Sequence, residues 1–351
     1  MATPVLRRMS DSHYAVINDC DDEMTRAPTK VLSIVGPGRS GTTILANILG
    51  EVQGIANAGE LRLLWQRGLI EQRPCGCGRP LVGCPVWSAV LNRVVADGAN
   101  LCTADELATA ISGIIRDQRE VTIRRNRLRA IRGATGGETG WAAMARMRAV
   151  TADVCSALAE VIGSPMIVDA SKAAHEAALL AAVDRIDHYV LHVVRDPRAV
   201  AYSWRRAKPL PISGGTTTMA TRGLLASVGR WTENCLGAEL LRRYVPHDRW
   251  LFLRYEDFVA APRISVDRVL AFVGVGTERP FVSDDTVVLG TNHTVSGNPN
   301  RFRTGSVRIV EDDEWSARMA RRDQMVIEAI TMPLLLRYGY PIRTAPRRAR
   351  T

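Results

Sequence analysis

Several features that would assign the chain to a class at once are absent from its 351 residues. No run of 18 apolar residues occurs, so no segment of the sequence is suited to crossing a membrane as a helix. The first 30 residues alternate charge and polarity without the apolar stretch of a secretory signal, and we therefore expect a cytoplasmic protein. The seven cysteines are odd in number, which argues against a full disulfide framework. We find no internal repeats.

Aromatic residues are few, at 5%, and the 36 acidic residues are outnumbered by 46 lysines and arginines. The formal charge of +10 favours an anionic ligand, a nucleic acid or an acidic membrane surface. Because single-stranded nucleic-acid grooves interleave aromatic with basic side chains, the low aromatic content leads us to expect no nucleic-acid partner. A hydrophobic content of 46% with 23% charged residues is typical of globular proteins and excludes a wholly disordered chain, a collagen or a coiled-coil rod.

Short apolar runs alternate with helical patterns along much of the chain. The runs Val31–Val35, Met166–Val168, Tyr189–Val194 and Trp250–Leu253 are typical of strands buried on both faces of a parallel sheet. Helical patterns are present at Ile44–Leu49, Ala173–Val183, Pro197–Arg205 and Ser265–Val273. This alternation predicts an α/β fold of the P-loop-like, three-layer kind, with a mostly parallel central sheet and right-handed crossovers.

The domain organisation follows from where this alternation holds. Residues 1–29 are polar and unpatterned and are expected to form a flexible arm, while residues 346–351 form a basic tail. We expect residues 30–345 to fold as a single domain. Within it, residues 60–160 interrupt the pattern and predict a mostly helical insertion over the carboxyl edge of the sheet, where the specificity for a ligand usually lies. Seven arginines between positions 116 and 132 favour a solvated helix face, with an acidic acceptor or a peripheral contact to an anionic membrane as alternatives.

A glycine-rich loop between the first strand and the first helix is the strongest local motif. It reads Gly36-Pro37-Gly38-Arg39-Ser40-Gly41-Thr42-Thr43. Backbone N–H groups at a helix start and glycines that allow close approach together make an anion site, to which Arg39 adds charge and Ser40, Thr42 and Thr43 add hydroxyl donors. The loop has the glycine spacing of a Walker A motif, but Thr42 stands where that motif has lysine.

A second basic motif follows the strand that ends at Val194. Asp196 suits a helix N-cap and Pro197 the first helical position, which places Ser203 about two turns into the helix. Arg195 at the strand end and the hydroxyl of Ser203 then converge on one point and are predicted to bind a second phosphate. The alternative is that Arg195 pairs with a carboxylate and Ser203 is an ordinary polar helix position.

With both motifs in place, the sequence resembles the sulfotransferases that use 3′-phosphoadenosine 5′-phosphosulfate (PAPS). Arg39, Ser40, Gly41, Thr42 and Thr43 are similar to the loop that binds the 5′-phosphosulfate, and the pair Arg195 and Ser203 is similar to the 3′-phosphate site. The resemblance covers roughly residues 30–60 and 165–310 and is greatest for bacterial and tyrosylprotein-type members.

The same resemblance implies further donor contacts. Tyr255, in the run Arg254–Asp257, matches the segment whose tyrosine reaches the adenine, although an isolated tyrosine at a strand end is as often simply buried. The segment 297–305 resembles the late basic loop that closes over the nucleotide. It reads Asn-Arg-Phe-Arg where cytosolic animal members have Arg-Lys-Gly, so both Arg301 and Arg303 are candidates for the phosphate contact.

Three residues are candidates for the chemistry. Arg39, and after it Lys172, are expected to neutralise the charge that develops on the leaving oxygen, since relatives have a similarly placed lysine. Glu60 lies 21 residues after Arg39 in a Gly-Glu context, as does the base of the tyrosylprotein type, and we expect desolvation to raise its pKa. His293 and His175 are the rival bases, ranked below Glu60. Arg62, two residues later, is expected near the site.

The cysteines of residues 71–88 have the spacing CxC-x6-C, at Cys75, Cys77 and Cys84. We favour packing in a turn of small residues. The alternatives are a disulfide or a zinc site that takes its fourth ligand from elsewhere in the chain.

The sequence therefore predicts a PAPS-dependent sulfotransferase that transfers the sulfuryl group in line to a small-molecule, glycan or lipid hydroxyl, or to a tyrosyl side chain, without a required metal. The alternatives are a P-loop kinase or nucleotide hydrolase with a degenerate Walker A loop, and a non-catalytic basic binding module.

Overall fold

The computed structural model describes residues 27–96, 104–136, 140–207, 209–212, 215–218, 220–275 and 279–342. Nearly all of the expected N-terminal arm, residues 1–26, and the whole of the basic tail 346–351 lie outside these ranges. Within the described part, every helix is too short or too polar to cross a bilayer.

Five parallel strands form the central sheet in the order β2-β3-β1-β4-β7. Their bounds are β1 (Thr29–Val35), β2 (Ile55–Gly59), β3 (Met166–Lys172), β4 (Ile186–Val194) and β7 (Trp250–Arg254). The prediction of an α/β fold with a parallel sheet is confirmed, and the four predicted strands are present. The edge strand β2 was not predicted, because its sequence Ile-Ala-Asn-Ala-Gly lacks the β-branched and aromatic run that identifies a strand.

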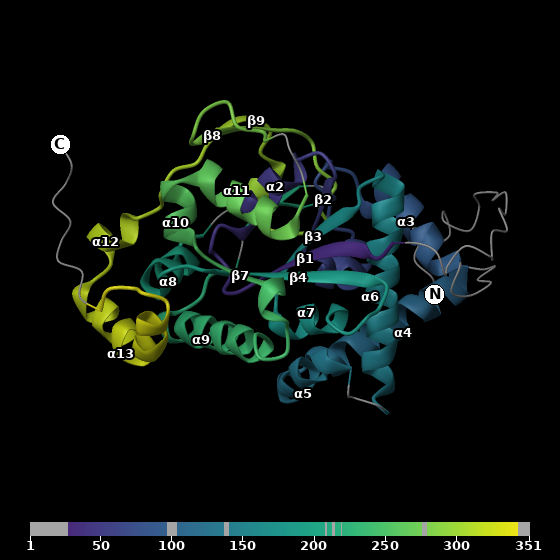
Figure 1. Cartoon of the computed structure of the whole chain (residues 1–351), viewed down its shortest axis with the longest axis horizontal. Coiled ribbons are helices and arrows are strands. Elements are labelled where there is room, and N and C mark those ends of the chain that lie inside the picture. Colours follow the sequence, from purple (N-terminus) through teal and green to yellow (C-terminus); the bar gives the residue numbers. More distant parts are fainter. Residues whose placement is uncertain are drawn as a thin grey trace.

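Helices cover both faces of the sheet, which confirms the three layers (Figure 1). One face packs against α2 (Thr42–Gly50), α10 (Tyr255–Ala260) and α11 (Pro262–Val273), and the other against α6 (Ala142–Ile162) and α7 (Ala174–Leu180). The alternation within β1 shows how the sequence specifies this: Leu32 and Ile34 join the core on the α2 side, whereas Val31 and Val35 face the opposite layer.

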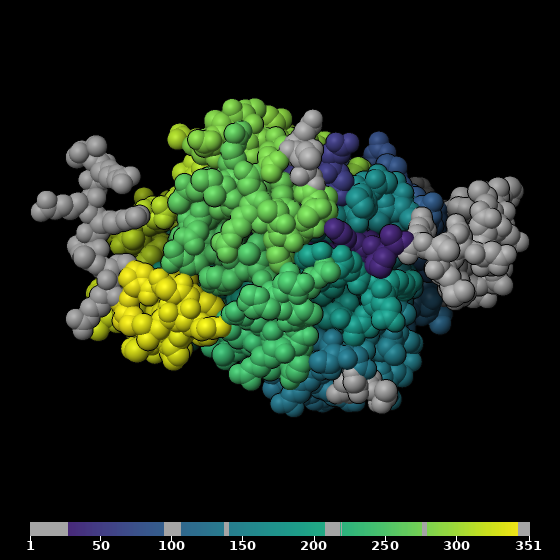
Figure 2. Space-filling view, in the orientation of Figure 1, coloured from purple at the N-terminus to yellow at the C-terminus, as the bar shows by residue number. Residues whose placement is uncertain are grey.

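The remaining elements surround this unit. The other helices are α3 (Pro85–Ala96), α4 (Ala104–Thr122), α5 (Arg127–Arg132), α8 (Pro197–Arg205), α9 (Leu224–Leu241), α12 (Glu314–Arg318) and α13 (Arg321–Arg337). Two antiparallel hairpins are formed by β5 (Pro209–Ile212) with β6 (Gly215–Thr218) and by β8 (Thr286–Leu289) with β9 (Gly305–Arg308). In the space-filling view the segment 224–275 covers the centre of this face, with α13 at its left end (Figure 2).

The region expected to be an insertion consists mainly of helices in its described part. Helix α6 packs on the sheet and on α3 and α4, and a buried cluster that includes Trp65, Trp87, Leu91 and Leu158 joins them. Six of the seven arginines between positions 116 and 132 are exposed, and the seventh, Arg127, forms an ion pair with Glu233.

The start of α8 has the capping geometry that its sequence indicates. The Asp196 carboxylate accepts a hydrogen bond from the backbone N–H of Arg198, and Pro197 occupies the first turn. The fully buried guanidinium of Arg198 bonds Asp196 and Glu328. Arg198 therefore anchors α13 on α8 and has a structural role.

The turn from β1 into the glycine-rich loop depends on Gly36. Its φ is +133°, and a Cβ at this position would lie 2.1 Å from the carbonyl oxygen of Val193 on β4. We predict that Gly36→Ala lowers the free energy of unfolding by at least about 1–3 kcal/mol, because strain adds to the clash. Chemical denaturation measures the change.

Gly229→Ala is the matched control for this substitution. Gly229 lies on the exposed side of α9 with open space around it, and alanine there should raise the stability by about 0.5–1 kcal/mol. If the two variants had equal stability, the tight turn at Gly36 would not be needed.

Candidate active site

Chemically active residues follow the carboxyl ends of the parallel strands and therefore lie at one edge of the sheet. The glycine-rich loop follows β1, Glu60 follows β2, and Lys172 is the last residue of β3. Arg195 follows β4, and Tyr255 comes directly after β7. Because all five strands run in the same direction, residues from five distant parts of the sequence meet at this edge, where ligands of open α/β sheets bind.

A cavity of about 900 Å³ opens at this edge. Both predicted anion motifs line it: Arg39, Gly41, Thr42 and Thr43 from the loop, and Arg195 with Ser203 from the second motif. Tyr255, Glu60 and Lys172 line the same cavity. The two motifs therefore face one space, as a single ligand with two anionic groups requires.

The lining of this cavity is strongly positive. Among the described residues it contains Lys172 and nine arginines, against two carboxylates. The arginines are Arg39, Arg62, Arg67, Arg73, Arg195, Arg222, Arg230, Arg303 and Arg308. Both carboxylates are already paired: Glu60 with Lys172, and Asp312 with Arg206 and with Arg195, so the predicted alternative that Arg195 pairs with a carboxylate is observed. Such an excess of cations in a concave site creates a potential that attracts polyanions.

The glycine-rich loop holds its groups ready for an anion. Gly41 has a φ of 70° and precedes the first residue of α2, so the unpaired N–H groups of that helix start open toward the cavity. The buried hydroxyl of Ser40 has no hydrogen-bond partner among the described residues. A buried donor left unpaired is costly, which indicates that a ligand completes the site.

Arg39 also lacks hydrogen-bond partners, and more of its atoms are affected. All three guanidinium nitrogens are buried without a partner in the described part of the chain, and the guanidinium lies 4.6 Å from the ring centroid of Trp204. Burial lowers the pKa of Arg39, and the charges of Arg206, Arg195 and Arg222 lower it further. A bound anion would relieve both the repulsion and the missing hydrogen bonds.

Arg195 connects the two anion positions. Its Nη1 donates to the backbone oxygen of Arg39 at 3.0 Å, while its Nε is buried and has no partner among the described residues. Its guanidinium lies 4.3 Å from the ring centroid of Tyr255, and that ring packs under the loop so closely that a Cβ at Gly41 would approach it to 2.7 Å. Ser203 on α8 is buried and lines the cavity.

Glu60 lies at the centre of an ionic network. Its Oε1 accepts from Lys172 Nζ at 2.7 Å, and its Oε2 accepts from Arg62 Nη2 at 3.0 Å. Burial alone would raise the pKa of Glu60, but the charges of Lys172 and Arg62 and their hydrogen bonds outweigh it and lower the pKa to about 2. The expectation of a raised pKa is therefore wrong, because the sequence could not show that both cations would contact the same carboxylate.

Three predicted candidates do not reach the main cavity. Arg301 is buried and donates to the backbone oxygens of Thr294 and Pro74, whereas Arg303 lines the cavity. Of the two rival bases, His175 lies outside the lining, and His293 lies against Cys84 with its Nδ1 3.2 Å from Sγ.

The sequence analysis missed several cavity residues. Trp204 lies beside two guanidinium groups, those of Arg39 and Arg222, at 4.6 and 4.5 Å from its ring centroid. Arg67 and Arg73 approach from the segment after β2. No local pattern marks these residues, because their convergence depends on the packing of distant segments.

Comparison with known proteins decides the family of the central region. The model of the sulfotransferase family matches residues 114–279. The chain contains a sulfotransferase-family region. No curated protein matches the chain. The sulfotransferase domain of the Synechococcus PCC 7002 olefin synthase is similar in structure, with a TM-score of 0.50 and 18% identity over 90% of this chain and 96% of that one. The sulfotransferase domain from the curacin biosynthetic pathway gives a TM-score of 0.46 and 17% identity over 90% and 100%.

The likeness to the olefin synthase domain supports the sulfotransferase fold for this chain. The tyrosylprotein-type branch stays a prediction.

The unpaired guanidinium of Arg39 in this cavity generates a test. We predict that Arg39→Gln unfolds at the same temperature as the unsubstituted protein or higher without ligand, because a buried repelling charge is removed. Its affinity for inorganic phosphate should fall about tenfold or more, since a hydrogen bond to a charged group is lost. Thermal unfolding across a phosphate titration measures both effects.

Arg337→Gln serves as the control, because Arg337 pairs with Glu239 on α9, away from the cavity. A phosphate response of Arg39→Gln equal to that of the control would place the anion elsewhere.

Proposed function

We propose that the chain is a PAPS-dependent sulfotransferase that transfers the sulfuryl group to a hydroxyl acceptor. The observation that carries this proposal is one cavity lined by residues of both anion motifs: Arg39, Gly41, Thr42 and Thr43 from the loop, and Arg195 with Ser203. A donor with phosphate groups on the 3′ and 5′ oxygens of one ribose needs two such positions in one space. The match of residues 114–279 to the sulfotransferase family supports sulfuryl transfer, and sulfotransferases generally use this donor.

The unpartnered groups fit such a donor. The buried Nε of Arg195 and the nitrogens of Arg39 offer hydrogen bonds that the described part of the protein leaves unused. In this proposal the loop residues Ser40, Gly41, Thr42 and Thr43 hold the 5′-phosphosulfate. Arg195 and Ser203 hold the 3′-phosphate.

The nucleoside and the late basic loop complete the donor site. Tyr255 lies between Arg195 and the glycine-rich loop, and in this proposal it contacts the adenine. Arg303, together with Gly297 and Asn298, lines the cavity from the late basic loop, and we assign to it a phosphate contact. Arg301 supports that loop from behind through Thr294 and Pro74.

The proposed chemistry uses the Glu60–Lys172 pair. The donor supplies the sulfuryl group: the acceptor oxygen forms a bond to sulfur as the bond from sulfur to the phosphate oxygen breaks. Glu60 takes the acceptor's proton, and Arg39 with Lys172 neutralises the charge left on the phosphate oxygen. Because Lys172 covers Oε1 of Glu60 in the free protein, it has to turn toward the donor before Glu60 is an effective base.

A kinase or nucleotide hydrolase is the weaker candidate. Magnesium in such enzymes is held by a hydroxyl after the loop lysine and by a free carboxylate. Here Thr42 replaces the lysine, and both carboxylates found in the described lining are engaged by cations. A non-catalytic basic module is also less well supported, because the positive charge lines a cavity at the carboxyl ends of the strands. A module that binds a polyanion on its surface would not need such a cavity.

Donor binding tests the proposal directly. We predict that adenosine 3′,5′-bisphosphate raises the melting temperature more than AMP does, because only the bisphosphate reaches Arg195 and Ser203. Ser203→Ala should weaken bisphosphate binding about tenfold or more and leave AMP binding unchanged. Isothermal titration calorimetry gives both dissociation constants.

Ser112→Ala, on an exposed part of α4, is the control for this measurement. Stronger stabilisation by ATP with Mg²⁺ than by the bisphosphate would favour the kinase alternative. Equal loss of AMP and bisphosphate binding in Ser203→Ala would contradict the assignment of the 3′-phosphate site.

The role of Glu60 generates a prediction about rate and pH. Glu60→Gln should lower turnover about 10²–10⁴-fold with bisphosphate affinity kept, because only the proton acceptor is lost. A pKa of about 2 keeps Glu60 ionised at neutral pH, so the free enzyme should show no acid limb from Glu60 above about pH 5. In Lys172→Met the loss of the cation raises this pKa, and kcat/KM should then fall at a higher pH as the solution is acidified.

Glu239→Gln is the control, because Glu239 on α9 pairs with Arg337 and neither residue lines the cavity. Full activity of Glu60→Gln would place the base elsewhere. An unshifted pH profile of Lys172→Met would contradict the coupling.

An assay can identify the acceptor, because the sulfated product shows which molecule received the sulfuryl group. We propose a small-molecule, glycan or lipid hydroxyl in the cytoplasm. Radiolabelled PAPS incubated with extracts of the source cells, followed by mass spectrometry, identifies the sulfated product and provides the turnover assay for the variants above.

A further inference from the structure

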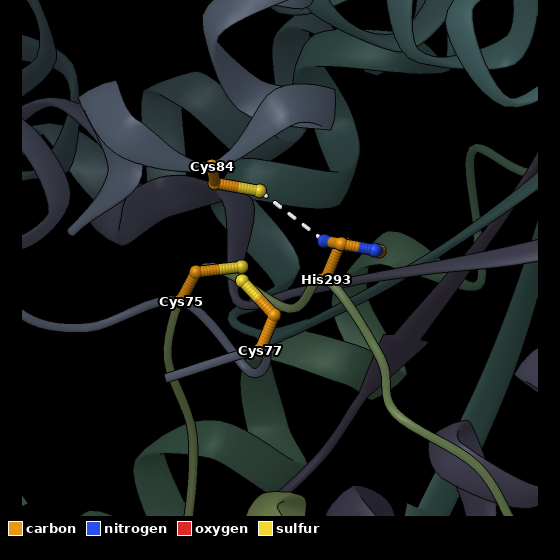
Figure 3. Close-up of side chains that lie close together, drawn as sticks. All are labelled: Cys75, Cys77, Cys84 and His293. Carbon is orange, nitrogen blue, oxygen red and sulfur yellow. Dashed lines mark hydrogen bonds between the residues drawn. The ribbon is translucent and has the colours of Figure 1, made fainter. Parts of the chain in front are cut away.

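Three cysteines and one histidine gather outside the donor cavity (Figure 3). The potential ligand atoms of Cys75, Cys77, Cys84 and His293 all lie within 4.8 Å of one another. Cys75 and Cys84 are fully buried, and Cys77 is half-buried. The three cysteines come from the segment before α3, whereas His293 is more than 200 residues later, just before the late basic loop.

The arrangement has the composition and dimensions of a tetrahedral site. Zinc–sulfur and zinc–nitrogen bonds of about 2.3 and 2.0–2.1 Å place neighbouring ligand atoms of a tetrahedron a little under 4 Å apart. The Cys84 sulfur and the His293 Nδ1 are 3.2 Å apart, and the side chains point toward a common centre (Figure 3). Three sulfurs and one imidazole nitrogen are a ligand set that selects zinc.

The backbone around the cluster is built to hold these ligands. The Cys75–Gly78 turn is closed by the Gly78 N–H donating to the Cys75 oxygen at 2.8 Å, with Gly78 at a φ of +84°. Gly76 lies so close to the histidine segment that a Cβ there would approach Asn292 Oδ1 to 1.9 Å.

Two hydrogen bonds fasten the histidine segment itself. The Gly76 N–H donates to the Thr294 oxygen at 2.9 Å, and the Trp87 indole donates to the His293 oxygen at 2.5 Å. Both bonds are accepted by backbone carbonyls, those of His293 and Thr294, and they hold the histidine segment against the cysteine segment and α3. Packing of small residues in a turn, which the sequence analysis favoured, does not account for a histidine nitrogen directed at the three sulfurs.

We propose that Cys75, Cys77, Cys84 and His293 bind one Zn²⁺ ion in a structural site. Four protein ligands fill a tetrahedral shell and leave no position for a substrate, and none of the four lines the donor cavity. The ion ties the segment before α3 to the segment that leads into the late basic loop.

This tie is continuous with the donor site. Arg301 donates to the Pro74 oxygen at 2.6 Å, next to the first cysteine, and to the Thr294 oxygen at 2.7 Å, next to the histidine. Two residues further on, Arg303 lines the donor cavity. Zinc therefore fixes the platform from which Arg303 approaches the ligand. The zinc site stands independently of the proposed function, and only its effect on donor binding rests on that function.

Metal analysis of the full-length protein, purified under reducing conditions without chelator, tests the site. We expect one zinc per chain by inductively coupled plasma mass spectrometry, and a loss of about tenfold or more in zinc retention for Cys84→Ser and His293→Ala. His293→Cys should keep the zinc, because thiolate replaces imidazole, and so should the control Cys155→Ser, whose buried thiol lies outside the cluster.

Protein that contains no zinc and takes up none from added zinc chloride would overturn the proposal. So would iron in place of zinc, or an intact mass showing a disulfide within the cluster. A folded His293→Ala variant that keeps its zinc would overturn the ligand assignment.

Removal of the ion tests its structural role. A chelator should lower the melting temperature by several degrees and expose the 290–305 segment to limited proteolysis, with both effects reversed by added zinc. Bisphosphate affinity should fall in parallel. Zinc present with no bisphosphate binding would refute the proposed function and leave the metal site standing, whereas unchanged melting and proteolysis after complete removal of zinc would refute the structural role.

Discussion

Positive charge gathered at the carboxyl edge of one parallel sheet, with too few carboxylates to balance it, is the constraint on which the site depends. The guanidinium of Arg39 is the extreme case, since it is buried beside other arginines without a hydrogen-bond partner in the described part of the chain. Like charges in a partly buried space repel one another and destabilise the fold unless an anion enters. The site is held together by backbone: the strand ends, the glycine turn at Gly36 and the capped start of α8 fix positions that the side-chain charges alone would push apart.

The excess of positive charge in the cavity also determines the state of Glu60, which is paired with Lys172. A carboxylate held at a pKa of about 2 is ionised yet weakly basic. In the proposed function, an arriving polyanion competes for Lys172 and so returns basicity to Glu60. The same cation would then neutralise charge on the donor as it uncovers the proposed base. This coupling gives a physical reason for a lysine at the end of β3, where a φ of 70° turns its backbone away from the regular strand.

Local patterns predicted the parts of the fold that local physics determines. The β1–loop–α2 unit, the capped start of α8 and the buried strands were readable, because a glycine turn, an Asp-Pro cap and a continuous apolar run each have one common structural meaning. Strand β2 was not predicted, because its small residues have little intrinsic preference for a strand. It forms because it pairs with the neighbouring strand β3. The pKa of Glu60, the stacking of Arg39 on Trp204 and the distinction between Arg301 and Arg303 depend on contacts between distant segments, which no single-sequence spacing encodes.

The Cys75–Cys77–Cys84–His293 cluster also depends on a contact between distant segments, which the sequence alone does not show. The spacing of the three cysteines favours turn packing and allows a zinc site only as an alternative that lacks a fourth ligand, whereas the sequence predicts His293 only as a rival base. In the folded chain His293 lies beside the three cysteines and provides the fourth potential ligand. The segment that leads into the late basic loop is held by Gly76, Trp87 and Arg301, and by the Val295 N–H, which donates to the Ala58 oxygen on β2. A further crosslink at this segment helps to keep Arg303 in place against the repulsion of the other cavity arginines. A buried four-ligand metal ion supplies such a crosslink without adding charge to the cavity itself.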